Sequence, residues 1–232
     1  MSSLEVVSAA FYKKTGRIRP FLASCEKHGI EPRLYGVGQK WENFCRNKVE
    51  LLVPEIDACR SEYVMYSDSD DVLFQADAAA IMGAYASLVP GMDRVAMSGD
   101  VRCWPYRTMK QRLLGMSPAG DPFPFICVGL FMGPKALLLD TVTTLRDAWR
   151  KGAPDVPPKL RDDDQCWWMH ELMHSHLSFV IDSGAKIVSS LHHVHASDVV
   201  RKEDGFHAFG RRPAIVHFNG DTSKHLRRGF GI

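Results

Sequence analysis

The chain has 232 residues, of which 45% are hydrophobic and 24% are charged, as in one globular domain with a real core. No apolar run approaches the roughly 20 residues that a membrane-spanning helix needs, and residues 1–5 lack the basic and apolar pattern of a signal peptide. The six cysteines include no CxxC pair. We therefore expect a single-domain cytoplasmic protein with reduced thiols and no membrane association, and its oligomeric state is left open.

Apolar runs and helical spacing alternate along the first hundred residues. Strands are predicted at Glu5–Ala10, at Arg33–Gly38, in the run that ends at Asp68, and at Arg94–Met97. Helices are predicted at Ile18–His28, Asn47–Arg60 and Ala76–Ser87. Pro54 should kink or split the second helix, because proline cannot donate a backbone hydrogen bond.

The alternation resumes after Tyr106–Pro124, a segment rich in glycine, proline and basic residues that we predict to be a mobile surface loop. Further strands are predicted at Phe125–Gly133, Ser178–Ile181, Lys186–Leu191 and Ala214–Phe218. Helices are predicted at Lys135–Arg150 and from the acidic residues 162–164 through His176. Strands that alternate with helices predict an α/β fold with a mainly parallel sheet.

One predicted strand ends in a concentrated group of carboxylates. The apolar run of residues 63–66 is followed by Asp68, Asp70 and Asp71 within four positions, and apolar sequence then resumes. This much negative charge at a strand end is costly unless a cation neutralises it, and carboxylate oxygens suit Mg²⁺ or Mn²⁺. Ligands also bind at the carboxyl ends of strands in open α/β sheets. The alternative interpretation is a solvated acidic turn.

Other polar side chains follow other predicted strands. His217 lies between an apolar strand and a small-residue turn, so it could be a further metal ligand, although a histidine there can also be structural. Asp100 and Trp104 follow the strand near residue 97. Asp163 and Asp164 could act on a ligand, or they could only cap the helix that they begin.

A competing motif lies in the helix that follows these aspartates. His170, Glu171 and His174 match H-E-x-x-H, the helical zinc signature of many metalloproteases. Their spacing places both imidazoles on one face of the helix, with histidines 192, 193 or 195 as a possible third ligand. A zinc hydrolase is therefore an alternative, as is a chance match in a histidine-rich helix.

Five segments resemble, in order and spacing, the glycosyltransferase domain of procollagen lysyl hydroxylases and its small stand-alone viral and phage relatives. The segments are YSDSDDVLF, MSGDVRCWP, CVGLFMG, RDDDQ and VHFNGD, and the similarity extends over roughly residues 4–224. The resemblance implies a GT-A fold, a UDP-sugar donor and Mn²⁺ (or Mg²⁺). It also implies one glycosyltransferase domain over residues 1–232, with a nucleotide-binding half at about 1–100 and an acceptor and metal half at about 101–232.

The resemblance assigns roles to individual residues. It implies that Asp68, Asp71 and His217 bind the metal and that Asp70 belongs to the donor site at a position where the family tolerates tyrosine. Lys48 would approach the diphosphate. Gly129 would also contact the donor, within a segment that lacks the asparagine and one of the glycines of the family's NSGGFIG.

The same resemblance places acidic side chains around the transferred sugar. Trp104 and Asp100 would border the sugar and acceptor pocket, and Asp163 and Asp164 would face the sugar itself. A divalent ion stabilises charge on a leaving diphosphate, while Asp100, Asp163 or Asp164 could orient or deprotonate an acceptor hydroxyl. Inversion and retention are both left open.

The acceptor is expected from the relatives and from clusters of basic residues. We expect glucose to be transferred to a 5-hydroxymethylpyrimidine in phage DNA, although the net charge of only +2 does not itself indicate a polyanion. The alternatives are a protein hydroxylysine, a saccharide, or a binding module without catalytic activity. The basic clusters comprise Lys13, Lys14, Arg17, Arg19, Lys110, Lys224, Arg227 and Arg228.

Overall fold

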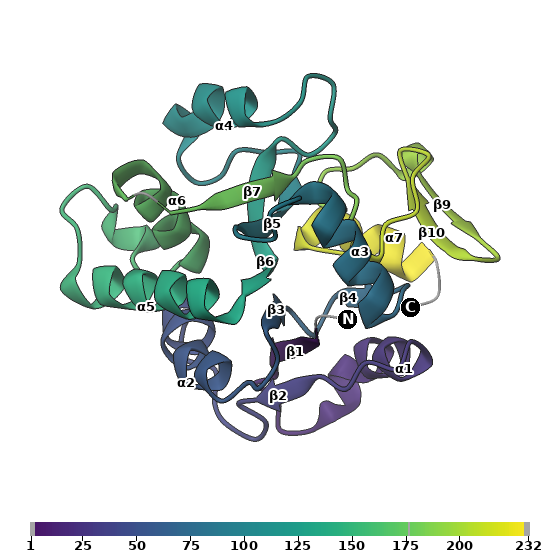
Figure 1. Cartoon of the computed structure of the whole chain (residues 1–232), viewed down its shortest axis with the longest axis horizontal. Helices are drawn as coiled ribbons and strands as arrows, with labels where there is room; N and C mark the ends of the chain where they lie inside the picture. Colours follow the sequence, from purple (N-terminus) through teal and green to yellow (C-terminus); the bar gives the residue numbers. More distant parts are fainter. Residues whose placement is uncertain (1–2, 176, 230–232) are drawn as a thin grey trace.

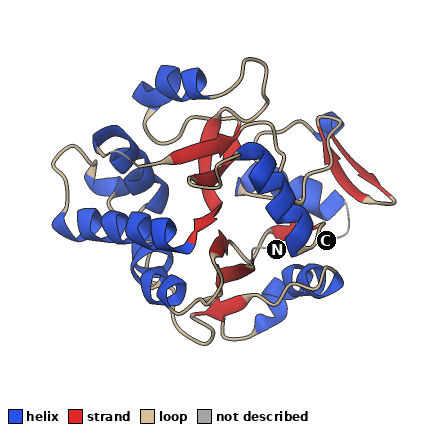
Figure 2. Ribbon diagram, in the orientation of Figure 1, coloured by secondary structure: helices blue, strands red, loops and turns tan. Residues whose placement is uncertain are grey.

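The computed structural model describes residues 3–175 and 177–229, apart from the side chains of residues 222, 224, 226 and 229. His176, the expected last residue of a helix, and the basic side chain of Lys224 therefore lie outside the described residues. Figure 2 shows helices arranged around a central group of strands.

A six-stranded sheet with the order β2-β1-β3-β6-β5-β7 forms the centre of the molecule. β1 pairs in parallel with β2 and β3, and β5 pairs in parallel with β7, whereas β6 is antiparallel to both of its neighbours. The expected mainly parallel α/β sheet is confirmed. Its strands are β1 (Leu4–Ala9), β2 (Arg33–Tyr35), β3 (Tyr63–Ser67), β5 (Val95–Asp100), β6 (Phe125–Pro134) and β7 (Phe179–Asp182).

Helices cover both faces of this sheet. Successive residues of a strand point to opposite faces, and here the side chains on both faces are largely apolar. In β3, Val64 and Tyr66 pack toward α2, α5 and α6, while Tyr63 and Met65 pack toward α1 and α3. Figure 1 shows the two groups of helices on opposite sides of the strands. The helices are α1 (Arg19–Lys27), α2 (Leu52–Asp57), α3 (Ala78–Leu88), α5 (Lys135–Lys151) and α6 (Asp164–His174).

A second sheet joins two distant parts of the chain. β4 (Val72–Phe74) pairs antiparallel with β11 (Ile215–His217), which pairs in parallel with β8 (Val188–Ser190). β4 was not predicted, since three residues are too few to show a period. A separate hairpin, also not predicted, consists of β9 (Val199–Lys202) and β10 (Gly205–Ala208). The last helix, α7 (Gly220–Gly229), follows β11 directly.

One sequence prediction needs correction, and the structure adds detail to another. The segment predicted as a loop contains a 3₁₀ turn (Arg107–Met109) and helix α4 (Lys110–Met116). Met109 and Leu113 are four residues apart, so they lie on one face of a helix, and both are buried. The predicted split helix begins as a π-helical segment (Arg46–Glu50) and is interrupted at Leu51 before α2. The predicted split is confirmed: in an unbroken helix residue 54 would have to donate its N–H to the carbonyl of Glu50, and proline has no N–H to donate. After the break at Leu51, Pro54 lies in the first turn of α2, where a missing N–H costs nothing.

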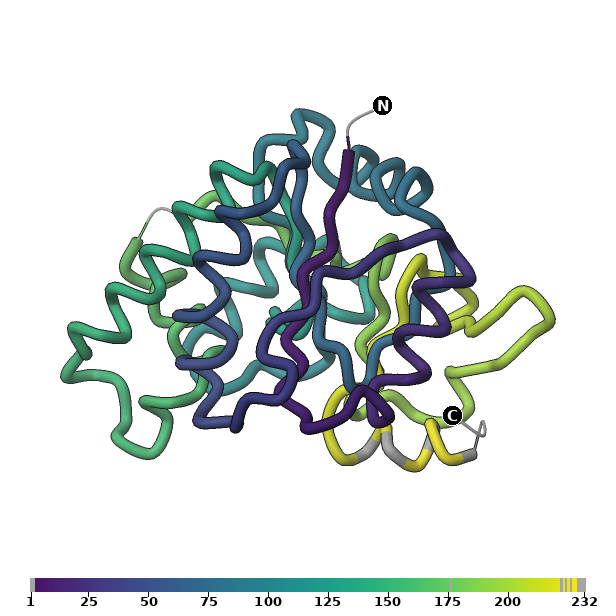
Figure 3. The backbone as a smooth tube through the Cα atoms, turned by 90° about the horizontal axis from the view of Figure 1, so that it is seen from below, coloured from purple at the N-terminus to yellow at the C-terminus, as the bar shows by residue number. Residues whose placement is uncertain are grey.

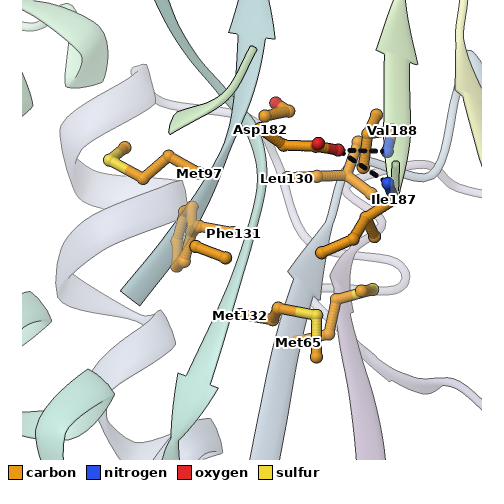
Figure 4. Close-up of a pocket in the computed structure, with 10 residues that line it drawn as sticks. Met65, Met97, Leu130, Phe131, Met132, Asp182, Ile187 and Val188 are labelled. Atoms are coloured by element: carbon orange, nitrogen blue, oxygen red, sulfur yellow. Dashed lines mark hydrogen bonds between the residues drawn. The ribbon is translucent and has the colours of Figure 1, made fainter. Parts of the chain in front are cut away.

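The turn between β7 and β8 is organised by one buried carboxylate. Asp182 accepts hydrogen bonds from the backbone N–H groups of Lys186, Ile187 and Val188 at 2.7–2.8 Å. Figure 4 shows this carboxylate beside apolar side chains such as Leu130 and Ile187. The space that these side chains line measures only about 10 Å³. That space could hold at most one water molecule, so the turn supports β8 and β11 rather than binding a ligand.

Candidate active site at the end of strand β3

Three side chains that suit a divalent cation converge where β3 ends. Nε2 of His217 lies 3.3 Å from Oδ1 of Asp71 and 4.0 Å from Oδ2 of Asp68. One ligand atom from each of the three residues lies within 4.8 Å of the others. Carboxylate oxygens and one imidazole nitrogen form a donor set that fits Mn²⁺ or Mg²⁺. The geometry therefore matches the predicted metal ligands.

The pairing of the small sheet brings these residues together. The turn after β3 carries Asp68 and Asp71, and the backbone N–H of Asp68 donates to the carbonyl of Gly129 at 2.8 Å. β4 then pairs with β11, so that His217 lies opposite Val72. The N–H of Phe218 also donates to the carbonyl of Asp71 at 2.8 Å. Strand register thus places a residue near the end of the chain beside residues 68–71.

The ring of His217 packs directly over a glycine. A Cβ atom at Gly129 would overlap the imidazole, so only glycine allows the ring to take this position on β6. Along the same strand, Sγ of Cys127 lies 3.8 Å from Nδ1 of the ring, which leaves Nε2 toward the carboxylates. Gly129 thus supports a candidate metal ligand, and its expected contact with the donor stays a prediction.

Buried charges balance one another within this group. Burial disfavours a charged imidazole, but the adjacent Asp71 carboxylate raises the pKa of His217 well above its usual range. Burial likewise opposes ionisation of Asp71, and His217 lowers the pKa of that carboxyl. The two residues therefore stabilise each other's charged forms.

Lys48 connects the acidic turn to the start of α6. Its Nζ lies 2.8 Å from Oδ1 of Asp68 and 3.4 Å from Oδ2 of Asp164, and the lysine is only 8% exposed. Although burial lowers the pKa of Lys48, the two carboxylates raise it well above its usual range. Asp68 also accepts a hydrogen bond from the hydroxyl of Tyr66 at 2.7 Å. A fixed positive charge therefore lies beside the candidate metal ligands, where a phosphate could approach.

The two neighbouring aspartates of α6 have different roles. The carboxylate of Asp163 accepts from the backbone N–H of Cys166 at 2.9 Å, so the predicted capping is confirmed for this residue. Asp164 is buried, faces Lys48, and has its pKa raised by burial. Asp164 is thus the member of the pair that adjoins the candidate site.

Asp70 faces the opposite way from its neighbours. Both of its oxygens accept hydrogen bonds from the guanidinium of Arg17, at 2.7 and 2.8 Å. This surface ion pair lies next to the acidic turn, outside the group formed by Asp68, Asp71 and His217. The role of Asp70 in donor binding stays a prediction, and we expect its contribution to be small because Arg17 engages both of its oxygens.

A pocket of about 300 Å³ lies around Asp100, and Asn219, two residues after His217, contributes to its lining. Asp100 is buried there, and it accepts hydrogen bonds from the N–H of Arg102 at 2.9 Å and from the side chain of Asn219 at 3.1 Å. Burial raises the pKa of Asp100. Trp104 is 50% exposed at the rim, and its carbonyl accepts from Gln165 at 2.8 Å. The structure thus brings together the predicted Asp100 and Trp104 around one opening.

Sequence reasoning missed an aromatic surface next to Lys48. Trp41 and Phe44 are 38% and 47% exposed, and their rings meet edge to face with centroids 5.2 Å apart. Nζ of Lys48 lies 5.6 Å from the ring centroid of Phe44. The sequence did contain a signal for this surface, since Trp41 stands among glycine, lysine, glutamate and asparagine in residues 36–43. A large aromatic side chain in such a polar segment indicates an exposed surface that binds a partner.

The histidines of the competing motif form a second group, away from this site. His170 and His174 approach Asp155, which precedes α6 and was not among the expected ligands. Glu171 contacts Nδ1 of His170 at 2.9 Å. Histidines 192 and 193 lie instead beside Asp100. Among residues 3–175 and 177–229, the candidate metal clusters are the group of Asp155, His170 and His174 and the group of Asp68, Asp71 and His217.

Comparison with known protein families identifies the chain. The family described as "PLOD GT domain" matches residues 1–228. The chain belongs to this family. The glycosyltransferase expectation is thereby confirmed, and the acidic turn with His217 is the candidate donor site of a PLOD-type glycosyltransferase domain.

Two relatives match nearly the whole of this glycosyltransferase domain. The multifunctional procollagen lysine hydroxylase and glycosyltransferase of Caenorhabditis elegans is 26% identical over 97% of the chain, and uncharacterized protein R699 of Acanthamoeba polyphaga mimivirus is 22% identical over 92%. The chain spans only 32% and 45% of the lengths of these relatives.

Solved structures support the fold of the domain. A glycosyltransferase involved in glycosylation of the major capsid of PBCV-1 aligns with a TM-score of 0.57 at 13% identity, covering 98% of both chains. The galactosyltransferase LgtC, in complex with donor and acceptor sugar analogues, aligns with a TM-score of 0.58 at 13% identity, covering 98% of this chain and 94% of its own. The expected GT-A-like fold is confirmed. Among the described residues, no helix is both long and apolar enough to cross a membrane.

Proposed function

We propose that this glycosyltransferase domain transfers a sugar, glucose by preference, from a UDP-sugar to an acceptor hydroxyl in a reaction that requires Mn²⁺ or Mg²⁺. The observation that carries this proposal is the convergence of Asp68 and Asp71, in the turn between β3 and β4, with His217 on β11. A divalent ion held there would supply positive charge where the leaving diphosphate becomes more negative.

The donor half of the proposal rests on groups next to the metal ligands. Lys48 provides a second positive charge for the diphosphate, held in place by Asp68 and Asp164. The exposed faces of Trp41 and Phe44 offer a surface on which a uracil ring could stack. These side chains would orient the donor so that its sugar reaches the pocket beside Asp100.

The acceptor half rests on the carboxylates around that pocket. Asp100 is buried and fixed by Asn219, so it could orient an acceptor hydroxyl or accept its proton. Asp164 could act on the sugar from the side of Lys48. Asp163 is a weaker candidate because its carboxylate is already engaged in capping α6.

For the acceptor we retain the hydroxyl of a 5-hydroxymethylpyrimidine in DNA, on the basis of basic residues near the site. Arg227 on α7 contributes to the lowered pKa of Asp71, which places positive charge close to the metal ligands. Figure 3 shows β1 running toward the edge of the molecule at which α7 lies, and Lys13 and Lys14 follow β1. A base in duplex DNA would have to flip out, and exposed Trp104 could stack on it.

The similarity to the Caenorhabditis elegans procollagen lysine hydroxylase and glycosyltransferase favours a second acceptor, a hydroxylysine side chain in a protein. The structure adds a reason to test both. Arg17 is one of the expected DNA-binding residues, but its guanidinium donates two hydrogen bonds to the carboxylate of Asp70. It is therefore less available to bind a phosphate. The two acceptors also differ in salt dependence, because binding to DNA weakens by about 0.9 log units per neutralised phosphate for each tenfold rise in salt.

A transfer assay separates these possibilities. The full chain is incubated with UDP-glucose and Mn²⁺ in the presence of hydroxymethylcytosine DNA, a hydroxylysine peptide or a free saccharide, and the products are weighed by mass spectrometry. A hexose added to DNA supports the first acceptor, and a hexose added to the peptide supports the second. Absence of both transfer and UDP release with any UDP-sugar, with Mn²⁺ or Mg²⁺ present, would contradict the proposed function.

A further inference from the structure

We propose that Asp155, His170 and His174 form a second metal site, which binds Zn²⁺ independently of the sugar-donor site. The two histidines lie one turn apart on the same face of α6, and Asp155 reaches them from the connection between α5 and α6. One ligand atom from each residue lies within 4.8 Å of the others. No step of the proposed sugar transfer uses any of these three side chains.

The distances between the two imidazoles and the carboxylate are compatible with ligands that share one ion. Nε2 of His170 lies 3.3 Å from one oxygen of Asp155, and Nε2 of His174 lies 3.3 Å from the other. Zinc bonds of about 2.0–2.2 Å at tetrahedral angles place neighbouring ligand atoms about 3.3–3.5 Å apart. Both separations are long for a direct hydrogen bond, whose usual length is about 2.9 Å, although the contact between His174 and Asp155 still qualifies as one. Both imidazoles turn Nε2 toward the same carboxylate, so all three side chains face a common point.

The second nitrogen of His170 is fixed in the way that metal-binding histidines commonly are. Its Nδ1 lies 2.9 Å from Oε1 of Glu171, and both residues are at least 91% buried. A carboxylate in this position fixes the ring and leaves Nε2 free to bind the ion. Because Glu171 is committed to this contact, it is poorly placed to act as the general base that a zinc hydrolase needs.

The chemistry of the donors distinguishes this site from the one at Asp68. Two imidazoles and one carboxylate suit Zn²⁺, whereas two carboxylates and one imidazole favour a harder ion such as Mn²⁺. The side chains of Asp155 and His174 are 50% and 55% exposed, and they line an open groove of about 640 Å³. An ion can therefore enter from solvent, and its fourth position faces the groove, where water or a small anion could bind.

A bound ion would join the α5–α6 connection to the C-terminal half of α6. The other end of the same helix presents Asp164 to Lys48. The ion would thus fix the helix that carries Asp164, without contact with the donor or the acceptor. Zinc should therefore raise the melting temperature of the protein, because a ligand that binds only the folded state stabilises it.

Zinc affinity of the full chain, measured by competition with a chromophoric chelator, tests the proposal. His174→Ala should weaken the tight site by about 100-fold or more, since a first-shell ligand is lost, and Glu171→Gln should weaken it by about 10- to 100-fold. His195→Ala is the matched control, because His195 is an exposed histidine whose Nδ1 is bonded to Ser197. His217→Ala should keep the tight zinc site while losing the donor-site ligand.

The thermal transition and the visible spectrum of Co²⁺ supply readouts that do not depend on activity. Zn²⁺ should raise the melting temperature of the wild type and of His195→Ala but not that of His174→Ala, and Co²⁺ should give a tetrahedral spectrum that His174→Ala abolishes. Equal zinc affinities of the wild type and His174→Ala would overturn the proposal. So would a tight zinc site that is lost in His217→Ala.

Discussion

Gly129 determines whether His217 can occupy its place beside the two aspartates. The imidazole lies against the backbone of β6 at this residue, and it is held from other directions by Cys127 and Asp71. Because the histidine is 98% buried within a paired strand, the ring has little room to move. The candidate metal site thus depends on the absence of one side chain.

Gly129→Ala should therefore weaken UDP binding in Mn²⁺ by at least about tenfold, and the forced shift should destabilise the fold by about 1–3 kcal/mol. Gly115→Ala in α4 is the control, because a Cβ atom there meets no other atom within 4 Å. The control should bind UDP normally and be no less stable. Calorimetric titration and thermal melting measure both effects, and unchanged UDP affinity in Gly129→Ala would contradict this role.

At the scale of elements, the start of α6 combines capping and a site residue in adjacent positions. Asp163 bonds to the backbone of the first turn, while Asp164 faces Lys48. The sequence placed both aspartates at a helix start but could not distinguish them, because the difference depends on the direction of each side chain. Asp163 is the N-cap residue, whose side chain turns back to the first turn, whereas Asp164 is the first residue of the helix and its side chain faces Lys48.

Substitution of Asp163 should mainly lower stability, whereas substitution of Asp164 should mainly lower turnover. Asp163→Ala removes a helix cap and should cost about 1 kcal/mol of stability, with a modest effect on sugar transfer. Asp164→Asn should lower turnover by far more than it lowers stability, with UDP affinity nearly retained. Steady-state kinetics and thermal melting of both variants test this difference. Equal and modest losses in the two variants would leave capping as the function of both residues.

Long elements could be predicted from sequence, and short or irregular ones could not. β3 and β6 were predicted because their apolar runs are long and bounded by polar turns. β4 is only three residues long, and α4 was obscured by the glycine and basic residues around Met109 and Leu113. The missed strand β4 connects directly to Asp71 and pairs with β11 at His217, so sequence alone could not explain how that histidine reaches Asp71.

At the scale of the whole molecule, the candidate donor site draws on segments from both ends of the chain. Asp68 and Asp71 precede residue 100 and His217 follows it, so the metal ligands span both expected halves, whose division stays a prediction. The sequence indicated these ligands because each follows a strand and matches a family motif. It could not reveal the outward turn of Asp70 or the exposure of Trp41, since both depend on contacts across the fold.

The central claim is that Asp68, Asp71 and His217 hold a divalent ion that binds the donor diphosphate. Calorimetric titration of UDP with Mn²⁺ tests it most directly, comparing Asp71→Asn with Asp70→Asn, a neighbouring aspartate paired with Arg17 on the surface. We predict that Asp71→Asn, or EDTA, weakens UDP binding by about 100-fold or more, equivalent to ~2.7 kcal/mol, while Asp70→Asn changes it by less than about fivefold. UDP binding unaffected by EDTA and by Asp71→Asn would contradict the account.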